Sequence, residues 1–420
     1  MKLPTIIDKA NSDAIYFPSI QPQYANQGLM LGLKFRSFSP AIKLLDFDFT
    51  DINSRLFTLP HVLHSAGIVN KHANPANNLM HNSYFKLNRV FLAMADSGGK
   101  QIATGVMSPT QQQIRDIFDW QCKYSDIAMT LDVPLGALSG ANSHIYSDFE
   151  GCLHLNLANL QNYVNWGANK HRYLNVLQGR DLTESDDWYS AVKGFDLYGW
   201  AFSYNHRMSM PIIIWRLLHL IKDGKFDKSE VWLHFLGAGD LKSAFMFTVI
   251  KQALNKRFAD CDIEVSFDTS TPFLLGGKHL TMLLDAVISP SRMTTPNLPL
   301  NKGTQKQWMN SKQPLPCTST KISQHVSKGD IVRNFQGTPW IDETSYLILQ
   351  NHNVEVAINA YDEVNAVYND KITSYHSTVP LNLAKAADAV FEILSVNDIK
   401  KSFKLLTTGA SNKIIKDMYK

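Results

Sequence analysis

The sequence contains little cysteine, and none of it occurs in closely spaced pairs. The four cysteines among 420 residues are far apart and form no CxxC motif; they are Cys122, Cys152, Cys261 and Cys317. Disulfide-stabilised extracellular domains and zinc ribbons both need cysteines in dense or paired spacing. We therefore expect reduced thiols, no structural disulfides and a cytoplasmic location.

The chain also lacks a long hydrophobic run. Its most apolar segment, MPIIIWRLLHLI at residues 210–221, is short and contains Arg216, and the first residues, MKLPTIIDKANSDAIYF, contain no apolar signal core. A bilayer span needs about 20 apolar residues, so we expect neither a membrane span nor export. Charge of one sign is not in large excess, because 41 Lys and Arg stand against 37 Asp and Glu. This balance permits a polyanionic partner without requiring one.

Short runs of β-branched and aromatic residues alternate with longer amphipathic segments. The segments 108–124 and 241–258 have apolar residues every three or four positions, as amphipathic helices do, and Ser108-Pro109 and Asp240 are plausible helix starts. This alternation predicts an α/β protein. The expected strands are RVFLAMA, DIAMTL, YLNVL, FDLY, VWLHFL and IEVSF, and the residues that follow them are Asp96, Asp132, Gln178, Gly199, Gly237 and Asp268.

The polar residues after these runs favour a closed (β/α)8 TIM barrel over an open, doubly wound sheet. In a closed barrel the carboxyl ends of all strands meet at one mouth, whereas an open sheet spreads them along an edge. Three carboxylates at one mouth repel one another unless a cation or a ligand lies among them. We therefore expect a ligand site there, although a single DSGG or LDVPLG sequence more often marks only a turn.

Other site motifs are incomplete or absent. FLGAGDLKSA at residues 235–244 suggests phosphate binding at a helix start, but Lys242 occupies the place of the third glycine in a dinucleotide fold. Nicotinamide and flavin binding are therefore disfavoured, and a phosphate or backbone contact by Gly237 and Gly239 stays open. The chain contains no GxSxG, which argues against a hydrolase with a nucleophile elbow.

Residues 296–330 are rich in Pro, Lys, Gln, Ser and Thr, which predicts a long polar insertion on the surface. Because this insertion holds one cysteine, Cys317, we expect a solvated loop rather than a structural zinc site, with an unconventional site including His325 and His352 left open. The segments 346–368 and 382–406 are expected to be helices of the outer ring. Without an internal repeat or linker, residues 1–420 are predicted to form one domain.

Six motifs resemble, in order and spacing, those of the tRNA-guanine transglycosylase (queuine/archaeosine) superfamily. They are DSGGKQ (96–101), LDVPLG (131–136), VLQGR (176–180), YGWAFS (198–203), HFLGAGDL (234–241) and SFDTSTPF (266–273). The resemblance implies an irregular (β/α)8 barrel, in agreement with the alternation of segments. It also implies an enzyme, a pentosyltransferase that exchanges a guanine in nucleic acid for a 7-deazaguanine base.

The same resemblance implies a role for each matching residue. Asp268 corresponds to the nucleophile that attacks the sugar C1′, and Asp96 to the acid that moves a proton at the base. Asp132 corresponds to the carboxylate that accepts hydrogen bonds from guanine N1 and the exocyclic amine, as an ionised carboxylate can. Further contacts to the base are implied for Ser97, Gln178, Gly179, Gly199 and Trp200. Such chemistry requires the target nucleotide to be flipped out of its stack.

The sequence departs from the superfamily pattern on the side that faces the nucleic acid. Lys100 replaces a stacking aromatic residue, an arginine after the nucleophile is replaced by Phe273, and the CxCxxC zinc module is missing, so we expect no cofactor. These changes point to the DpdA-like branch, which places 7-cyano-7-deazaguanine or related bases into DNA. Phosphate contacts are expected from Lys302, Lys306, Lys312, Lys321 and Lys328 and from the basic tail, Lys400, Lys401, Lys404, Lys413, Lys416 and Lys420.

Two alternatives remain open at this stage. One keeps the chemistry and changes the polymer from DNA to tRNA. The other is a non-catalytic barrel that only binds nucleic acid. The expected partners are DNA or tRNA and a 7-deazaguanine base, without a membrane.

Overall fold

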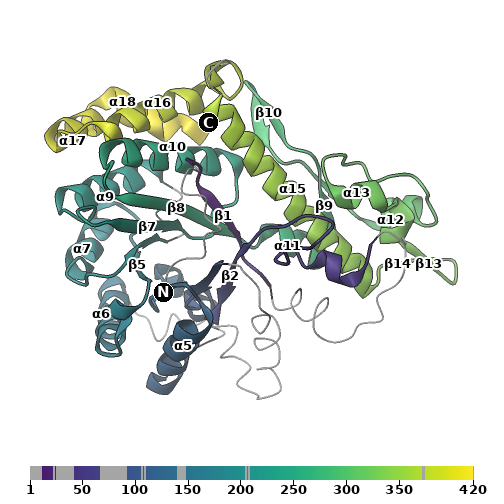
Figure 1. The fold of residues 1–420 in the computed structure, drawn as a ribbon, viewed down its shortest axis with the longest axis horizontal. Coiled ribbons are helices and arrows are strands. Elements are labelled where there is room, and N and C mark those ends of the chain that lie inside the picture. Colours follow the sequence, from purple (N-terminus) through teal and green to yellow (C-terminus); the bar gives the residue numbers. More distant parts are fainter. Residues whose placement is uncertain are drawn as a thin grey trace.

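The computed structural model describes residues 12–21, 24, 42–66, 92–105, 107, 110–139, 148–203, 206, 209–370 and 374–419. Within them, an eight-stranded parallel sheet has the strand order β1-β8-β7-β6-β5-β4-β3-β2 (Figure 1). The strands are β1 (Ile15–Pro18), β2 (His61–Ser65), β3 (Leu92–Asp96), β4 (Ile127–Met129), β5 (Tyr173–Leu177), β6 (Gly199–Phe202), β7 (Glu230–Phe235) and β8 (Asp262–Thr269).

The two edge strands of this sheet meet and nearly close it into a barrel. Ser19, directly after β1, forms a parallel bridge with Leu63 of β2. The backbone N–H of Ile20 donates to the carbonyl of Leu63 at 3.0 Å. Helices lie between successive strands, so the expected α/β class with a parallel barrel sheet is confirmed, consistent with a (β/α)8 barrel.

The helices that follow the strands cover the outside of the barrel (Figure 1). Most of them begin with a capping side chain, among them the Thr110 capping box before α5 and Asp240 before α10, the start expected from sequence. Ser108 and Pro109 lie outside the described residues. The helices are α4 (Gly99–Ala103), α5 (Gln111–Tyr124), α6 (Phe149–Asn165), α7 (Leu182–Val192), α9 (Met210–Lys222), α10 (Leu241–Arg257) and α11 (Thr271–Gly277), with short 3-10 turns η1 (Leu44–Phe47), η2 (Leu135–Ser139) and η3 (Ala168–Lys170).

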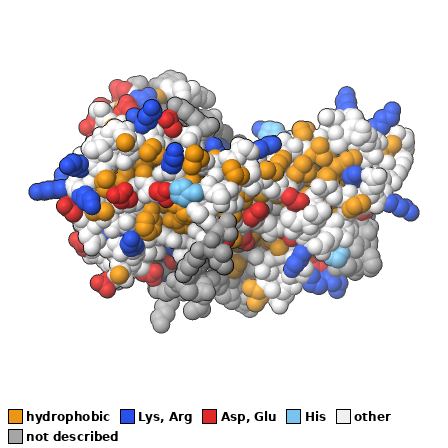
Figure 2. All heavy atoms as spheres, turned by 90° about the horizontal axis from the view of Figure 1, so that it is seen from above, with side chains coloured by type: hydrophobic (Ala, Val, Ile, Leu, Met, Phe, Trp, Pro, Cys, Tyr) orange, Lys and Arg blue, Asp and Glu red, His pale blue; other side chains and the backbone are white. Residues whose placement is uncertain are grey.

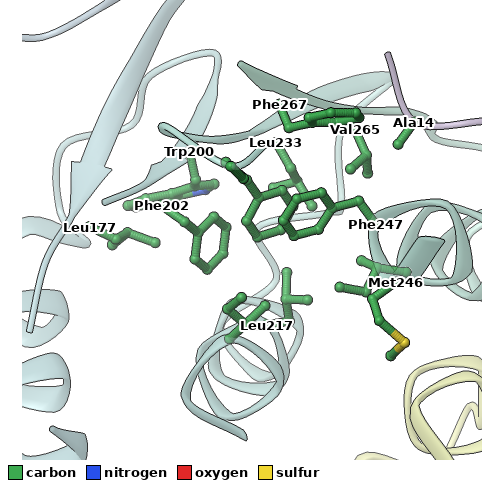
Figure 3. Packing of buried hydrophobic residues seen from close by; sticks show 14 of the residues in the cluster. Ala14, Leu177, Trp200, Phe202, Leu217, Leu233, Met246, Phe247, Val265 and Phe267 are labelled. Carbon is green, nitrogen blue, oxygen red and sulfur yellow. The ribbon is translucent and has the colours of Figure 1, made fainter. Parts of the chain in front are cut away.

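Alternation along the strands separates an inner core from an outer one. Inward side chains form a cluster inside the barrel that includes Phe17, Leu63, Met94, Met129, Val176 and Trp232. Outward side chains pack against the helices, where Phe235 stacks on Phe247 of α10 with ring centroids 4.1 Å apart (Figure 3). By the same alternation, Asp96 of β3 and Asp268 of β8 belong to the inward set.

One predicted strand is misplaced. FDLY at residues 195–198 is a turn after α7, in which the N–H of Leu197 donates to the carbonyl of Phe195, and the strand runs from Gly199 to Phe202. The sheet requires a glycine there, because a Cβ on Gly199 would lie 2.0 Å from the Trp232 carbonyl oxygen. Strands β1 and β2 were not predicted, since Pro18 and two histidines break up their short apolar runs.

The prediction that residues 296–330 form a solvated surface loop is wrong. Together with their neighbours they fold into what we call the lysine-rich lobe (residues 281–342), on the right of Figure 1. Leu300, Trp308, Leu315, Ile322 and Ile331 are buried in a second core that includes Phe47, Phe49 and Leu56. The lobe contains β9 (Thr281–Leu283), β10 (Val287–Ser289), β11 (Arg292–Thr294), β12 (Asn297–Pro299), α12 (Lys302–Trp308), α13 (Lys321–His325), α14 (Lys328–Ile331), β13 (Arg333–Phe335) and β14 (Thr338–Trp340).

A single long helix, α15 (Glu343–Asn369), joins the lobe to the barrel. Its first half contributes Leu347, Ile348 and Val354 to the core of the lobe. Its second half contributes Ala360 and Tyr361 to the outer core of the barrel. The chain then continues through η4 (Tyr375–Ser377), α16 (Leu381–Ser395), α17 (Ile399–Thr407), α18 (Gly409–Lys416) and η5 (Asp417–Tyr419).

The basic C-terminal residues lie far from the lysine-rich lobe. Lys400, Lys401 and Lys404 are on α17 and Lys413 and Lys416 on α18, at the opposite end of the molecule in Figure 1. The two groups of lysines therefore do not form one continuous surface. Lys420 is outside the described residues. Among the helices that the structure describes, none combines the length and apolarity needed to cross a bilayer.

Candidate active site at the barrel mouth

Three carboxylates lie at the carboxyl ends of the barrel strands. Asp96 ends β3, Asp132 follows β4, and Asp268 is the penultimate residue of β8. Burial raises the pKa of Asp96, and the negative charge of Asp268 raises it further. Burial raises the pKa of Asp132 to about 7, with a contribution from the charge of Asp96. The charge of Asp268 thus acts on Asp96 and that of Asp96 on Asp132, and all three acids follow strand ends on the same side of the barrel.

The DSGG turn is shaped to bring Asp96 and Asp132 together. Gly98 has a φ of 102°, in the left-handed region that favours glycine. A Cβ on Gly99 would lie 2.7 Å from Oδ1 of Asp132, so only a glycine admits that carboxylate. Interactions with Ser65 and with the backbone of Ser97 and Gly98 partly offset the effect of burial on the pKa of Asp96. The backbone angle at Gly98 and the contact at Gly99 thus explain why both positions are glycine.

Asp132 is held in place by Gln178, which follows β5. The Gln178 side-chain amide donates from Nε2 to Oδ2 of Asp132 at 2.5 Å and to the Val133 carbonyl at 3.2 Å. Its Oε1 accepts from the N–H of Leu135 at 2.9 Å. The amide expected to read the base carbonyl is therefore engaged on both sides. In this structure Gln178 positions the carboxylate and the loop that carries it.

Asp268 receives two hydrogen bonds on the same oxygen. Its Oδ1 accepts from the N–H of Gly237 at 2.7 Å and lies 3.3 Å from Nε2 of His234. Gly237 has a φ of 67°, which turns the chain directly after β7 so that its N–H faces β8. Oδ2 has no hydrogen-bond partner in the described part of the chain. The sequence left open a phosphate or backbone contact for Gly237, and in the structure its backbone N–H binds the Asp268 carboxylate.

His234 was missed by the sequence reasoning. It is fully buried and pairs Asp268 with a second group, since its Nδ1 lies 2.8 Å from the hydroxyl of Ser266. That hydroxyl accepts from Nε1 of Trp232 at 2.7 Å. The same hydroxyl donates to the Leu233 carbonyl at 3.4 Å, and Nε2 of His234 can donate to Asp268 when it carries the ring proton. Alternation within VWLHFL places His234 on the same inward face as Trp232, and that pattern is the signal that could have identified it.

The hydroxyl of Ser97 is buried and has no hydrogen-bond partner among the described residues. It stands directly after Asp96 in the mouth. A buried hydroxyl without a partner costs roughly 1–3 kcal/mol. Such an atom beside a group of carboxylates is a place where a polar ligand atom can form a bond.

Three residues expected to contact the base do not face the mouth of the barrel or have a structural role there. Gly199 pairs with Leu174 and Trp232 at the amino end of β6, remote from the mouth, so the expectation that its amide serves the site is wrong. Trp200 belongs to the outer core (Figure 3) and its ring packs against Tyr189 of α7, so it cannot supply the missing stacking ring. Gly179 has a φ of 145°, and a Cβ there would lie 2.5 Å from the backbone nitrogen of Ser185, which makes it a contact point for α7.

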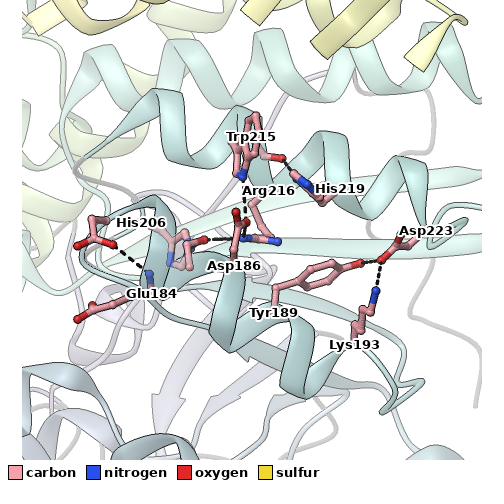
Figure 4. A network of polar contacts seen from close by, with 11 residues as sticks. Glu184, Asp186, Tyr189, Lys193, His206, Trp215, Arg216, His219 and Asp223 are labelled. Atoms are coloured by element: carbon pink, nitrogen blue, oxygen red, sulfur yellow. Dashed lines mark hydrogen bonds and ion pairs between the residues drawn. The ribbon is translucent and has the colours of Figure 1, made fainter. Parts of the chain in front are cut away.

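A second polar network lies beside the end of β6 (Figure 4). Arg216 of α9 is fully buried, binds Asp186 and donates to the Ser185 hydroxyl at 2.9 Å. The same hydroxyl lies 2.9 Å from Nε2 of His206, whose pKa burial lowers to about 3. These contacts tie α9 to α7 and hold the segment after β6 in place. We assign them to the scaffold of the mouth.

The possible metal ligands of the lysine-rich lobe and of α15 do not assemble. His352 is buried with Nδ1 at 3.1 Å from the Thr320 hydroxyl and Nε2 at 3.0 Å from the Leu283 carbonyl, so neither nitrogen is open to a metal. The Cys317 thiol donates to Asp285 at 2.7 Å. Neither these residues nor His325 belong to a group of three side chains able to hold a metal, and no such group occurs in the ranges described.

Comparison with known proteins adds no assignment. No protein-family model matches the chain, and no curated protein matches it in sequence. Function is therefore inferred from the geometry of the mouth.

Proposed function

We propose that this chain is a guanine transglycosylase that replaces guanine in DNA with a 7-deazaguanine base of the 7-cyano-7-deazaguanine type. The observation that carries the proposal is the group of Asp96, Asp132 and Asp268 at the ends of three barrel strands. Among the described residues, no Lys or Arg contributes to the pKa of Asp96 or Asp132. A ligand that donates hydrogen bonds would stabilise the ionised form of such buried carboxylates.

Guanine meets this requirement because its Watson–Crick edge presents N1–H and an exocyclic amine side by side. An ionised Asp132 accepts both, and Gln178 keeps the carboxylate oriented for that contact. The unpartnered hydroxyl of Ser97 can bond a further atom of the same ring. Cytosine and thymine are smaller and present a different pattern of donors, so the site selects a purine with two adjacent donors.

The proposed reaction proceeds in two displacements at C1′. Oδ2 of Asp268 attacks C1′, the C1′–N9 bond breaks, and its electron pair goes to N9 of the leaving guanine, which takes a proton from Asp96. The raised pKa of Asp96 suits a group that holds this proton near neutral pH. The 7-deazaguanine base then loses its N9 proton to Asp96 and attacks C1′, and the bond to Asp268 breaks.

The contacts of Asp268 fit the part of a nucleophile. Gly237 and His234 both bond Oδ1, which fixes the carboxylate and leaves the other oxygen for C1′. Three acids in one site thus divide into a base reader, a proton carrier and a nucleophile.

The test is base exchange with labelled guanine or 7-cyano-7-deazaguanine in the presence of plasmid DNA, denatured DNA or bulk tRNA. Label in DNA that is lost in Asp268→Asn supports the proposal. Label in tRNA alone would move the activity to tRNA. If the protein binds nucleic acid but introduces label into none of the polymers, it is a binding protein and not an enzyme.

A further inference from the structure

The tip of the lysine-rich lobe is a two-stranded hairpin made of β13 and β14. Arg333 pairs with Trp340 and Phe335 with Thr338, so these four side chains share one face of the hairpin. Gln336 and Gly337, with φ of 50° and 82°, form the two-residue turn that matches the twist of the strands. The side chain of Asn334 fixes the turn by accepting from the N–H of Gly337 at 2.8 Å. The face is therefore well defined.

This face exposes two large aromatic rings. Phe335 is 59% and Trp340 54% exposed, and their ring centroids lie 5.9 Å apart. Other apolar side chains of the lobe, such as Trp308 and Ile331, are buried in its core, and Val287, at 38% exposure, is less exposed than either ring. Large aromatic rings that stay exposed while neighbouring apolar side chains are buried are typical of a binding surface.

The surroundings of the two rings are basic. From residue 296 to 342 the chain has six basic residues, Lys302, Lys306, Lys312, Lys321, Lys328 and Arg333, and two acidic ones, Asp330 and Asp342. Both acids serve the fold: Asp330 bonds Ser327 in a capping box, and Asp342 caps α15 and pairs with Arg333 at 3.5 Å. Helix α12, which carries Lys302 and Lys306, packs against β14. In Figure 2 the outer edge of this lobe carries several Lys and Arg side chains.

We infer that this basic aromatic face binds a single-stranded segment of the nucleic acid. The rings of Phe335 and Trp340 stack on bases, and the lysines of α12 with Arg333 contact phosphates. Ring faces can stack only on bases that are not already stacked in a duplex, which favours an unpaired strand. A protein partner would fit a larger and less charged apolar patch.

The inference rests on the proposed function for its substrate and adds a requirement to it. A base can enter the mouth only after it leaves the duplex. A surface that holds the neighbouring nucleotides unpaired reduces the cost of that step. The lobe then selects the state of the strand, while the mouth selects the base.

The experiment measures the binding of a labelled single-stranded oligonucleotide and of its duplex by fluorescence anisotropy. Wild type, Phe335→Ala, Trp340→Ala and the double variant are compared at fixed salt. Because each ring is expected to stack on one base, each single variant should bind the single strand roughly tenfold more weakly. Leu381→Ala, at the start of α16, removes a residue with 52% exposure elsewhere and should bind as wild type does.

Wild-type affinity for the single strand in the double variant would overturn the inference, as would a loss of the same size for duplex and single strand. A change in the mass of the free protein in Trp340→Ala, with unaltered oligonucleotide binding, would instead make the face a contact between protein molecules. The outcome is independent of catalysis. Base exchange with unchanged binding in the double variant contradicts this inference alone, and ring-dependent binding without any base exchange contradicts the proposed function alone.

Discussion

His234 determines how the carboxylate of Asp268 is presented. It lies between Ser266 and Asp268 in a chain of buried hydrogen bonds that starts at Trp232. We expect His234→Phe to form the covalent complex with DNA about 10- to 100-fold more slowly, because a hydrogen bond to a charged group is lost. Trapping on denaturing gels with an analogue that cannot be exchanged measures this rate.

The matching control for His234 is His219→Gln, since His219 is a half-buried histidine on α9 that contacts the Trp215 carbonyl. An unchanged trapping rate in a folded His234→Phe protein would remove His234 from the site. Asp268→Asn should give no covalent band. A persistent band in that variant would place the nucleophile on another residue.

Asp132 makes stability and base binding depend on pH in opposite directions. Its folded-state pKa of about 7 lies above the ordinary value of 3.8, so its contribution to stability is complete below pH 4 and is lost as pH rises through 7. We expect Asp132→Asn to melt on the order of a few degrees higher than wild type at pH 8 and at the same temperature near pH 4. Melting temperatures at both pH values test this.

Binding of the free base should follow the ionised form of Asp132 and strengthen as pH rises through about 7. The Asn variant should bind weakly at every pH. Equal base affinity of wild type and variant at pH 8 would show that Asp132 does not contact the ligand.

Part of the site could be predicted residue by residue. Asp96 and Asp268 end strands with strong apolar runs, so their place at the mouth follows from the strand pattern. The role of Gln178 could not be predicted, because it depends on bonds to the loop 132–135, which has no regular pattern. Gly199 was misplaced because the strand begins four residues later than its apolar run.

At the scale of elements, the lysine-rich lobe uses Asp285 to tie two of its segments together. Its carboxylate accepts from the Cys317 thiol at 2.7 Å, from the N–H of Thr318 at 3.1 Å and from that of Ser319 at 3.2 Å. Although burial alone would raise the pKa of Asp285, these bonds lower it to about 2. Hydrogen bonds to this one carboxylate therefore join the segment after β9 to residues 317–319.

We expect Asp285→Ala to lower the free energy of unfolding by about 1–3 kcal/mol at pH 7. The stabilisation is present above pH 4 and is lost as pH falls through 2, because the folded-state pKa is depressed. Hydrogen exchange of residues 317–331 locates the effect in the lobe. Asp260→Ala, at an exposed turn, is the control, and equal exchange in both variants would contradict the assignment.

The lobe shows which elements a sequence pattern misses. Its helices are short, as in α13 (five residues) and α14 (four residues), so no periodic face develops along them. Its apolar residues are spread along a polar stretch and meet only in the folded core with Phe47 and Phe49. Asn301 and Thr320 cap α12 and α13, but without a periodic run behind them such residues indicate turns as readily as helices.

At the scale of the whole molecule, α15 makes the barrel and the lobe one structure. Its first half lies in the lobe core and its second half against α10, and the hydroxyl of Tyr361 donates to the Gly239 carbonyl beside the mouth at 2.8 Å. The prediction of a helix at 346–368 agrees with α15 in type and place. What this helix connects could not be predicted, because both of its ends look equally amphipathic in the sequence.

A rigid connection of this kind sets a minimum length for the substrate. From Glu343, beside the hairpin, to Tyr361, beside the mouth, a helix rises about 27 Å. A stacked strand covers that distance with roughly eight nucleotides. In a series of shortened oligonucleotides with one target guanine, exchange should fall sharply when fewer than about eight nucleotides remain on one side of the target. A uniform decline with length, or none, would mean that the two contacts are not made by the same strand. If exchange does fall sharply at that length, the distance from hairpin to barrel sets how wide a gap in a DNA duplex must be before one of its bases can be exchanged.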